Sequence, residues 1–463
     1  MSRLRLASSA TTVQAPALLS RFPRTSRRRA LVLAILVAAL AIRVAGVAAT
    51  PGYAPRHDDH SYDHLALGVA RNGDFPVVGD RPTAYRPPGF PYVLGAVYAI
   101  AGSGHDRITV ARYVQAVIGT ILVGLIGMLA WWSIGAAAGL WAMVIAAVYI
   151  PLVAVGAALL SEPMFAALML GALLCVLGFR RTAGQRPGWT RLRWALLAGA
   201  LGGALSLTRT NGLVVLIALA LGLWTGRPAG VRWRSWRAVA PVLAMLAAAV
   251  VAIAPWAIRN EIVMHTFIPV SDEQGGTLAG TYNPVSDHDP VAPASWHLLT
   301  QIPDYYARSR AQAARPEPQL QSRLTSLALR YVRHHPLYPL KVAFYNGVRL
   351  LDLGGLHRAE FTAISAGVTS PGVADAGVVC FWIVALLALA GLAMRRVRRS
   401  LPGFLWLAAA LVLASILFVN TETPRFRVPL DPFFILIAAG ALAAIAERVG
   451  RPRPGRRTGA EVA

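Results

Sequence analysis

Acidic side chains and cysteines are both scarce in this chain of 463 residues. It has 21 Asp and Glu against 45 Lys and Arg, a formal net charge of +24, and only two cysteines. Cys175 and Cys380 both lie in apolar runs, which excludes a disulfide framework or a cysteine-based metal cluster. The arginines do not form a basic patch with interleaved aromatic residues, so the positive charge does not indicate a nucleic-acid partner.

The arginines instead cluster in short segments between apolar runs. Hydrophobic residues make up 56% of the chain and charged residues only 14%, and the apolar runs, at about twenty residues each, are long enough to cross a bilayer. Arg-rich segments between such runs are typical of cytoplasmic loops, whose natural partner is the anionic surface of the lipid bilayer. The sequence therefore predicts an all-α polytopic protein of the cell membrane.

A topology of ten spans places every short Arg-rich loop on the same side of the membrane. No small-residue cleavage site follows the first apolar run, so we expect that run to be retained as a span. Two short spans within 194–224, separated by LTRTNG, keep the later arginines inside. The other eight are expected at about 30–48, 109–132, 137–154, 160–178, 238–256, 373–394, 402–419 and 429–446. Both termini are then cytoplasmic.

This topology divides the chain into a disordered basic tail, a transmembrane domain and a second basic tail, at residues 1–29, 30–447 and 448–463. Within the domain, a first outer loop at 49–108 and a large outer loop at 257–371 face outside. The apolar segment at 89–101 is too short to cross a bilayer, so we expect an interfacial or re-entrant helix there. Another juxtamembrane helix is expected near 337–352.

The first outer loop gathers ionisable groups that are rare elsewhere in the chain. Such groups next to membrane spans are costly and tend to mark function. Asp58 and Tyr62 are four residues apart and share a helix face, where a carboxylate can accept a proton from a hydroxyl. Arg86 precedes two prolines, and its planar guanidinium suits a phosphate. Together they indicate a reaction on a lipid-linked phosphate.

Several motifs resemble the GT-C superfamily of integral membrane glycosyltransferases, in its family 39-type branch of protein O-mannosyltransferases and lipid A aminoarabinose transferases. The pattern D-D-x-x-Y-x-x-x-A at 58–66, followed by YRPPGFP at 85–91, resembles the first outer loop of that group. Later landmarks follow in order: SEP at 161–163, LTRTNGL at 207–213, PWAIRN at 255–260 with Gly275–Gly276, and PRFRVPLDP at 424–432. The resemblance spans roughly residues 30–447 and implies the GT-C fold.

The resemblance also implies an activity. Such enzymes transfer a sugar, here a hexose or pentose, from a polyprenyl-phosphate donor to an acceptor hydroxyl at the outer face, usually with inversion. The acceptor is a glycolipid, a polysaccharide or a protein. The residues given roles are Asp58 as general base, Asp59 as a second acid, Arg86, Arg259 and Arg425 as contacts of the donor phosphate, and Tyr62 and Glu162 as acceptor-side or supporting residues. Interfacial anchoring is the alternative for Arg259 and Arg425.

A metal site is an open alternative. The sequence departs from the aminoarabinose branch at Tyr85, where that branch has an acid before the basic residue, and this puts a family metal site in doubt. His60 and His64 are one helical turn apart, a spacing at which two imidazoles can bind zinc. A third ligand is not evident, and histidines at a hydrated membrane edge are usually only polar surface. The sequence therefore predicts no definite cofactor, and a divalent metal stays open.

Two other functions are compatible with the sequence. A transporter or flippase for a polyprenyl-linked lipid would place its charges near the bilayer midplane, often within inverted repeats, whereas here they lie at an outer edge and no inverted repeat is evident. An inactive scaffold of an envelope-assembly complex would not need an intact Asp58 and Arg86. For an enzyme, we expect Asp58→Asn to lower turnover by about 10²–10⁴-fold and to change donor affinity little.

Overall fold

The computed structural model describes residues 26–75, 77–78, 81–182, 189–303, 316–364, 367–368, 370–419 and 424–449. The regular secondary structure of these residues is helical, apart from a short antiparallel ribbon in which β1 (Val77–Val78) pairs with β2 (Arg81–Pro82). The predicted all-α class is therefore confirmed. Most of the two predicted basic tails, the loop around Arg186 and residues 420–423, between two of the predicted spans, lie outside the described residues.

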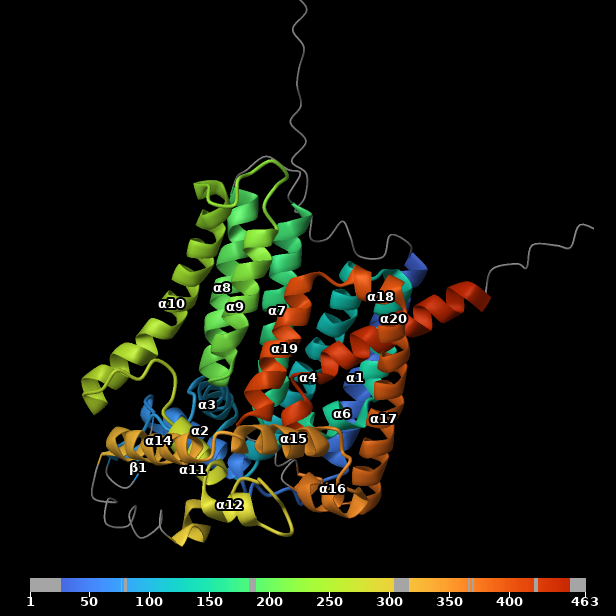
Figure 1. The fold of residues 1–463 in the computed structure, drawn as a ribbon. Coiled ribbons are helices and arrows are strands. Elements are labelled where there is room, and N and C mark those ends of the chain that lie inside the picture. The colour runs from blue at the N-terminus through green and yellow to red at the C-terminus, as the bar shows by residue number, and fades with distance from the viewer. Residues whose placement is uncertain are drawn as a thin grey trace, which may run out of the picture.

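A bundle of apolar helices forms most of the structure (Figure 1). Six of the described helices are long and apolar enough to cross a membrane: α1 (Ser26–Ala48), α4 (Arg107–Ser133), α7 (Glu162–Arg181), α10 (Trp236–Met264), α17 (Pro371–Ala393) and α20 (Asp431–Val449). A seventh span results if α5 (Ala136–Val148) and α6 (Ile150–Gly156), bent by 56°, count as one. The remaining predicted spans coincide with α8 (Trp189–Thr208), α9 (Gly212–Thr225) and α19 (Gly403–Leu417).

The central helix of the bundle is α7, which packs against α4, α8 and α9. In its most apolar stretch 78% of the residues are buried, against 17% in α1 and in α10. Exposed apolar side chains on those two outer helices, such as Leu33 and Val251, face the hydrocarbon of a bilayer. Small residues allow α8 to approach α10 closely, since a Cβ added to Gly199 would lie only 2.0 Å from the carbonyl oxygen of Met245.

The bend between α5 and α6 is stabilised by an arginine of α1. Pro151 has no N–H, so the carbonyl of Ala147, four residues earlier, lacks its helical partner. Tyr149 is extended at this point, with φ −70° and ψ 104°. Arg43, only 1% exposed, donates to the carbonyl oxygens of Ala147 at 3.3 Å and of Ala146 at 3.1 Å. A buried arginine therefore supplies the hydrogen bonds that the bend removes.

The shorter helices gather at one end of the bundle, where α14 and α15 lie across it (Figure 1). They are α2 (Asp58–Asn72), α3 (Gly89–Ala101), α11 (Gln274–Thr281), α12 (Pro284–His288), α14 (Glu317–His334), α15 (Tyr338–Leu350) and α16 (Leu356–Ala363), with the 3-10 turns η2 (Leu299–Gln301) and η4 (Pro424–Arg427). Helices thus occur at the short segment 89–101 and near 337–352, as predicted. The small α18 (Arg395–Ser400) lies at the opposite end.

One helix end differs from the sequence-based expectation. We expect a span ending at about residue 256, whereas α10 continues through Pro255 to Met264. A proline inside a membrane helix is tolerated because neighbouring groups satisfy the backbone it frees. On the turns after Pro255, Trp256 and Asn260 donate side-chain hydrogen bonds to the carbonyls of Val270 and Ile268, which hold the following segment back against the helix.

Replacing Arg43 should destabilise the bundle. Arg43→Met keeps an apolar stem but leaves the carbonyls at the bend without donors, and each unpaired buried carbonyl costs about 1–3 kcal/mol. We expect a clearly lower unfolding temperature of the purified protein in detergent. The exposed Arg237 of α10 provides the matched control, because Arg237→Met removes the same charge without touching the bend. Equal unfolding temperatures for the two variants would contradict this account of Arg43.

Candidate active site

Six charged side chains meet where the short helices cover the end of the bundle. Three are carboxylates and three are arginines, and each comes from a different break between helices: Asp58 at the start of α2, Arg86 before α3, Glu162 at the start of α7, Arg209 between α8 and α9, Glu273 before α11, and Arg425 in η4. We call them the six-charge cluster. Their formal charges cancel.

Asp58 is held by two arginines at once. Arg86 Nη2 donates to Asp58 Oδ1 at 2.5 Å, and Arg425 Nη2 donates to Asp58 Oδ2. Burial by itself would raise the pKa of Asp58, but the two guanidinium groups outweigh it and hold that pKa well below its usual range. Asp58 is therefore a carboxylate at any physiological pH, with both oxygens occupied. Its side chain is still 28% exposed.

The other two carboxylates extend this contact in both directions. Glu273 Oε2 accepts from Arg86 Nη1 at 3.2 Å, and burial raises the pKa of Glu273 by more than Arg86 lowers it. Glu162 is fully buried, with Oε1 2.9 Å from Arg209 Nη1 and 3.6 Å from Arg425 Nη1. The cluster is thus one chain of alternating charge that runs from Glu273 to Arg209 and has Asp58 inside it.

Aromatic rings and hydroxyls enclose the cluster. The Arg86 guanidinium lies 5.6 Å from the ring centroid of Tyr62 and 5.4 Å from that of Tyr85. Burial raises the pKa of Tyr85 to about 12, so this hydroxyl stays neutral. Tyr62 Oη lies 3.2 Å from Ser161 Oγ, which also accepts a hydrogen bond from Arg209 at 3.1 Å. These groups restrict water, and charge–charge interactions are stronger where water is restricted.

A clamp of hydrogen bonds fixes the segment that carries Arg86. Glu317, the first residue of α14, accepts hydrogen bonds from Thr83 Oγ1 and from the backbone N–H of Ala84, both at 2.7 Å. The backbone N–H of Asp272 donates to the carbonyl of Ala84 at 3.2 Å. Arg259 donates to the carbonyl of Thr83 at 3.1 Å. Arg86 is therefore positioned from three separate elements.

The structure brings five of the predicted site residues together: Asp58, Tyr62, Arg86, Glu162 and Arg425. Arg259 instead belongs to the clamp, where its guanidinium also lies 5.0 Å from the ring centroid of Trp256. Its contacts with described residues are to backbone carbonyls, to the neighbouring Asn260 and to aromatic rings, and not to the six-charge cluster.

Asp59 also lies apart from the cluster, although it is next to Asp58 in the sequence. Its Oδ1 accepts the backbone N–H groups of Arg56, His57 and His60 at 3.0, 2.8 and 3.0 Å. Its Oδ2 accepts a hydrogen bond from the Tyr53 hydroxyl at 2.6 Å. Asp59 therefore caps the start of α2, and both of its oxygens serve the loop that leads into that helix.

The two histidines named as metal candidates are exposed at the surface of α2. His60 and His64 point away from the protein interior, and Asp63 between them is paired with Arg107 at 2.7 Å and accepts from the Tyr98 hydroxyl at 2.8 Å. Within the ranges that the structure describes, no group of three or more His, Cys, Asp or Glu residues is arranged to hold a metal ion. The described residues thus supply no third ligand for a zinc site here.

Sequence reasoning assigned no site role to Arg209 or Glu273. Arg209 interrupts a long apolar run, and an ionisable residue at such a point is itself a signal of function. Glu273 precedes Gly275–Gly276, where the chain passes very close to α14, since a Cβ on Gly275 would lie 2.2 Å from the carbonyl oxygen of Gln321. The charge in an apolar run and the Gly-Gly pair are both visible in the sequence. The ion-pair partners of Arg209 and Glu273 lie far away along the chain, so the sequence does not show which residues they meet.

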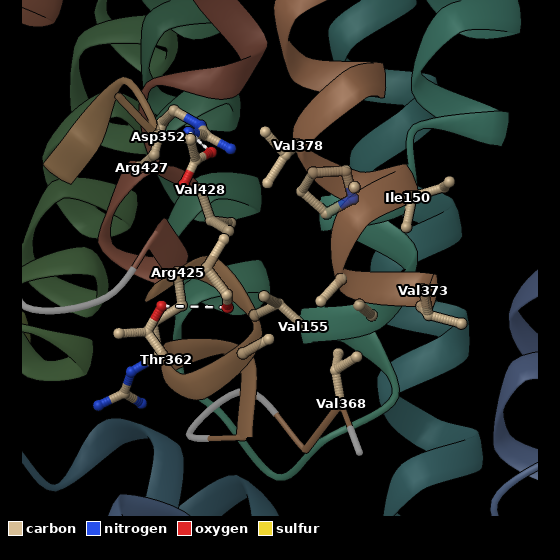
Figure 2. A pocket seen from close by; sticks show the side chains of 16 residues that line it. Ile150, Val155, Asp352, Thr362, Val368, Val373, Val378, Arg425, Arg427 and Val428 are labelled. Atoms are coloured by element: carbon tan, nitrogen blue, oxygen red, sulfur yellow. Dashed lines mark hydrogen bonds and ion pairs between the residues drawn. The ribbon is translucent and has the colours of Figure 1, made fainter. Parts of the chain in front are cut away.

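An apolar pocket lies beside Arg425 (Figure 2). It has about 520 Å³ of empty space, part of it open to solvent, and is lined by α6, α16, α17 and η4, mainly through aliphatic side chains such as Val155, Val373 and Val378. Its charged lining residues are Arg425, Arg427 and Asp352. Arg427 is paired with Asp352 at 2.7 Å, so Arg425 is the cation at the pocket that also reaches the six-charge cluster.

Comparisons with known proteins give the fold. No family model and no curated protein sequence matches the chain. The oligosaccharyltransferase AglB from the archaeon Archaeoglobus fulgidus, solved with an inhibitory peptide and a dolichol-phosphate, superimposes with a TM-score of 0.55 at 13% sequence identity, over 92% of this chain and 51% of that one. The chain has the GT-C fold. The fold prediction is confirmed, and the chain spans about half the length of AglB.

Two further structures are similar at a lower level. The protein O-mannosyltransferase complex Pmt1-Pmt2 of Saccharomyces cerevisiae, bound to its sugar donor, gives a TM-score of 0.44 at 17% identity over 56% of this chain and 36% of that one. ArnT from Cupriavidus metallidurans in the apo state gives 0.38 at 16% identity, over 91% of this chain and 79% of that one. With TM-scores below 0.5, these two structures are not used to assign the fold.

The clamp should make stability depend on pH. Burial and then the carboxylate of Glu317 raise the pKa of Asp272 to about 8, whereas an unfolded chain has an Asp pKa of about 3.9. Between these values the folded state binds the proton and the unfolded state does not, so stability falls as pH rises. We expect the unfolding temperature to fall between pH 5 and pH 8, and to fall less in Asp272→Asn.

The control for this pH series is Asp106→Asn, a change of the same charge at an exposed position before α4. That variant should follow the wild-type slope. If Asp272→Asn also follows it, Asp272 does not hold a proton in the folded protein.

Proposed function

We propose that this protein is a glycosyltransferase that moves a sugar from a polyprenyl-phosphate donor to an acceptor hydroxyl at the outer face of the cytoplasmic membrane, with inversion. The observation that carries this proposal is Asp58 held between Arg86 and Arg425 at one end of an apolar bundle. A carboxylate beside two guanidinium groups combines a base with cations suited to phosphate. The GT-C fold, shared with a structure that contains a dolichol-phosphate, supports this donor class.

The arginines of the cluster act on the leaving phosphate. The donor is a phosphodiester, and when its bond to the sugar breaks the electron pair stays on a phosphate oxygen. The phosphate therefore gains negative charge in the transition state, and fixed cations stabilise charge that develops there. Arg86 and Arg425 bind this phosphate, and the aromatic walls keep Arg86 in place.

Asp58 acts as the general base. It accepts the proton of the acceptor hydroxyl while the hydroxyl oxygen bonds to the anomeric carbon from the face opposite the phosphate, which inverts that carbon. A positioned base of this kind contributes about 10²–10⁴-fold to the rate. Asp59 supports this role indirectly, because its bonds to the backbone fix the start of α2. Arg259 likewise acts through the segment that carries Arg86.

The apolar pocket beside Arg425 takes the hydrocarbon chain of the donor. Its aliphatic lining, together with Arg425 among the lining residues, suits a lipid whose phosphate lies at that arginine (Figure 2). Burying apolar surface contributes about 0.8 kcal/mol for each CH₂ group, so the first isoprene units add substantially to binding. The location of the cluster at the end of the bundle, rather than halfway along the spans, argues against the transporter alternative.

A transfer assay tests the proposed activity. Purified protein is incubated with radiolabelled sugars on a panel of polyprenyl-phosphate donors, with membrane lipids, polysaccharides and proteins as acceptors. We expect transfer from at least one donor, and about 10²–10⁴-fold lower turnover in Asp58→Asn. Asp106→Asn, which removes an exposed charge away from the cluster, should retain full turnover. If Asp58→Asn transfers sugar as fast as the wild type, Asp58 is not the base. If the wild type transfers sugar from none of the donors, the protein is not the proposed glycosyltransferase.

The orientation is tested by labelling single cysteines. The basic helix α18 lies at the end opposite the cluster, and basic segments mark the cytoplasmic side. With Cys175 and Cys380 replaced by Ala, an impermeant thiol reagent applied to intact cells should label Val291→Cys, which is 88% exposed. It should label Arg234→Cys, in the connection between α9 and α10, only after permeabilisation. The reverse pattern would place the cluster in the cytoplasm.

A further inference from the structure

The contacts of Asp58 present a conflict with its role as a base. A general base needs a free lone pair within hydrogen-bonding reach of the proton it removes. Each oxygen of Asp58 already accepts an arginine N–H group. These contacts take two of its about four lone-pair sites and lower its affinity for a proton. A phosphate that binds Arg86 and Arg425 through the same N–H groups would have to share them with Asp58.

We propose that Asp58 and the phosphate of the lipid substrate compete for Arg86 and Arg425, so that Asp58 is locked in the free protein and released when the phosphate binds. This inference rests on the proposed function in one respect, namely that the site accepts a lipid phosphate. It adds an order of events, because the acceptor hydroxyl meets an available base only after the donor has bound.

The charge balance of the cluster favours such a displacement. Three arginines are neutralised by three carboxylates, so an added phosphodiester leaves the group with one excess negative charge. Two anions on the same guanidinium edge repel each other strongly where water is restricted. A carboxylate that shares its arginines with the phosphate is therefore driven to withdraw from them.

Asp58 is the carboxylate best able to withdraw. Its side chain is 28% exposed, against 23% for Glu273 and 0% for Glu162. It is also the only one of the three that lies between Arg86 and Arg425, the pair that the phosphate approaches. The side chain of Glu162 is fully buried. Its withdrawal from the arginines would leave a buried charge without a partner, which costs far more free energy than the withdrawal of the partly exposed Asp58.

Withdrawal changes what Asp58 can do. Away from the guanidinium groups it loses the interactions that hold its pKa low, so its affinity for a proton rises. A free oxygen then accepts the acceptor proton as the new bond to the anomeric carbon forms and the bond to the phosphate oxygen breaks. Binding of the donor phosphate thereby frees the base that is needed for sugar transfer from that donor.

Direct binding measurements test this competition without any turnover. The probe is farnesyl phosphate, and the uncharged farnesol serves as its control, with the purified full-length protein in detergent. Asp58→Asn removes the competing charge, and hydrogen bonds to charged groups are each worth about 10- to 100-fold in an equilibrium. We therefore expect Asp58→Asn to bind farnesyl phosphate about tenfold tighter or more, with unchanged affinity for farnesol.

A second variant covers the case in which Asp58→Asn fails to fold. Glu273→Gln frees only one edge of Arg86, so it should tighten binding of farnesyl phosphate by a smaller factor. Asp106→Asn, the exposed control, should bind it as the wild type does. Unchanged or weaker binding of farnesyl phosphate by a folded Asp58→Asn overturns the proposal, and so does unchanged binding by Glu273→Gln where Asp58→Asn does not fold.

The outcome is separable from that of the transfer assay. If the variants bind farnesyl phosphate more tightly but the wild type transfers no sugar, the competition stands and the proposed activity fails. If the wild type transfers sugar while removal of Asp58 leaves phosphate binding unchanged, the activity stands and the competition is refuted.

Discussion

The alternating chain of charges around Asp58 is the constraint on which the end of this bundle depends. Charges withdrawn from water are stable only when each one has a partner. Six segments that are distant in the sequence each supply one member of the six-charge cluster, and every member lies at a break between helices. Removing Arg86 leaves Glu273 without an ion-pair partner in the cluster, and removing Glu162 does the same to Arg209. The positions of α2, α3, α7, α11 and η4 relative to one another are therefore coupled through these contacts.

Other buried arginines explain how this arrangement is held. Arg427, two residues after Arg425 and 1% exposed, is paired with Asp352 and Asp431, which fixes η4 between the end of α15 and the start of α20. Arg43 satisfies the bend between α5 and α6. Several arginines thus bind backbone carbonyls or buried carboxylates inside the protein. Only part of the arginine excess therefore comes from the Arg-rich loops that predict the cytoplasmic side. The planar guanidinium, with five donors, suits all of these sites.

The sequence predicted the fold class and most of the cluster, because motifs and local density of ionisable groups are visible along the chain. It placed Asp59 in the site as a second acid beside Asp58, whereas the two side chains have different surroundings. Successive residues on a helix point in directions about 100° apart, so one carboxylate meets Arg86 and the other meets Tyr53. The pairing of Glu273 with Arg86 joins residues separated by 187 positions, and no local pattern encodes such a pair. The sequence-based expectation that Asp58→Asn changes donor affinity little takes no account of these contacts, and the proposed competition predicts tighter phosphate binding instead.

The proposed competition for the two arginines also bears on how the proposed reaction would end. The leaving group of that reaction would be a phosphate monoester with a charge of about −1.5 to −2 at neutral pH, so Arg86 and Arg425 would hold it more strongly than the donor. Asp58 would then carry the proton of the acceptor and could not displace it. Once that proton had passed to the phosphate or to water, Asp58 would again be an anion next to its two arginines and would compete for them. The interaction that locks the base in the free protein would therefore also promote release of the product.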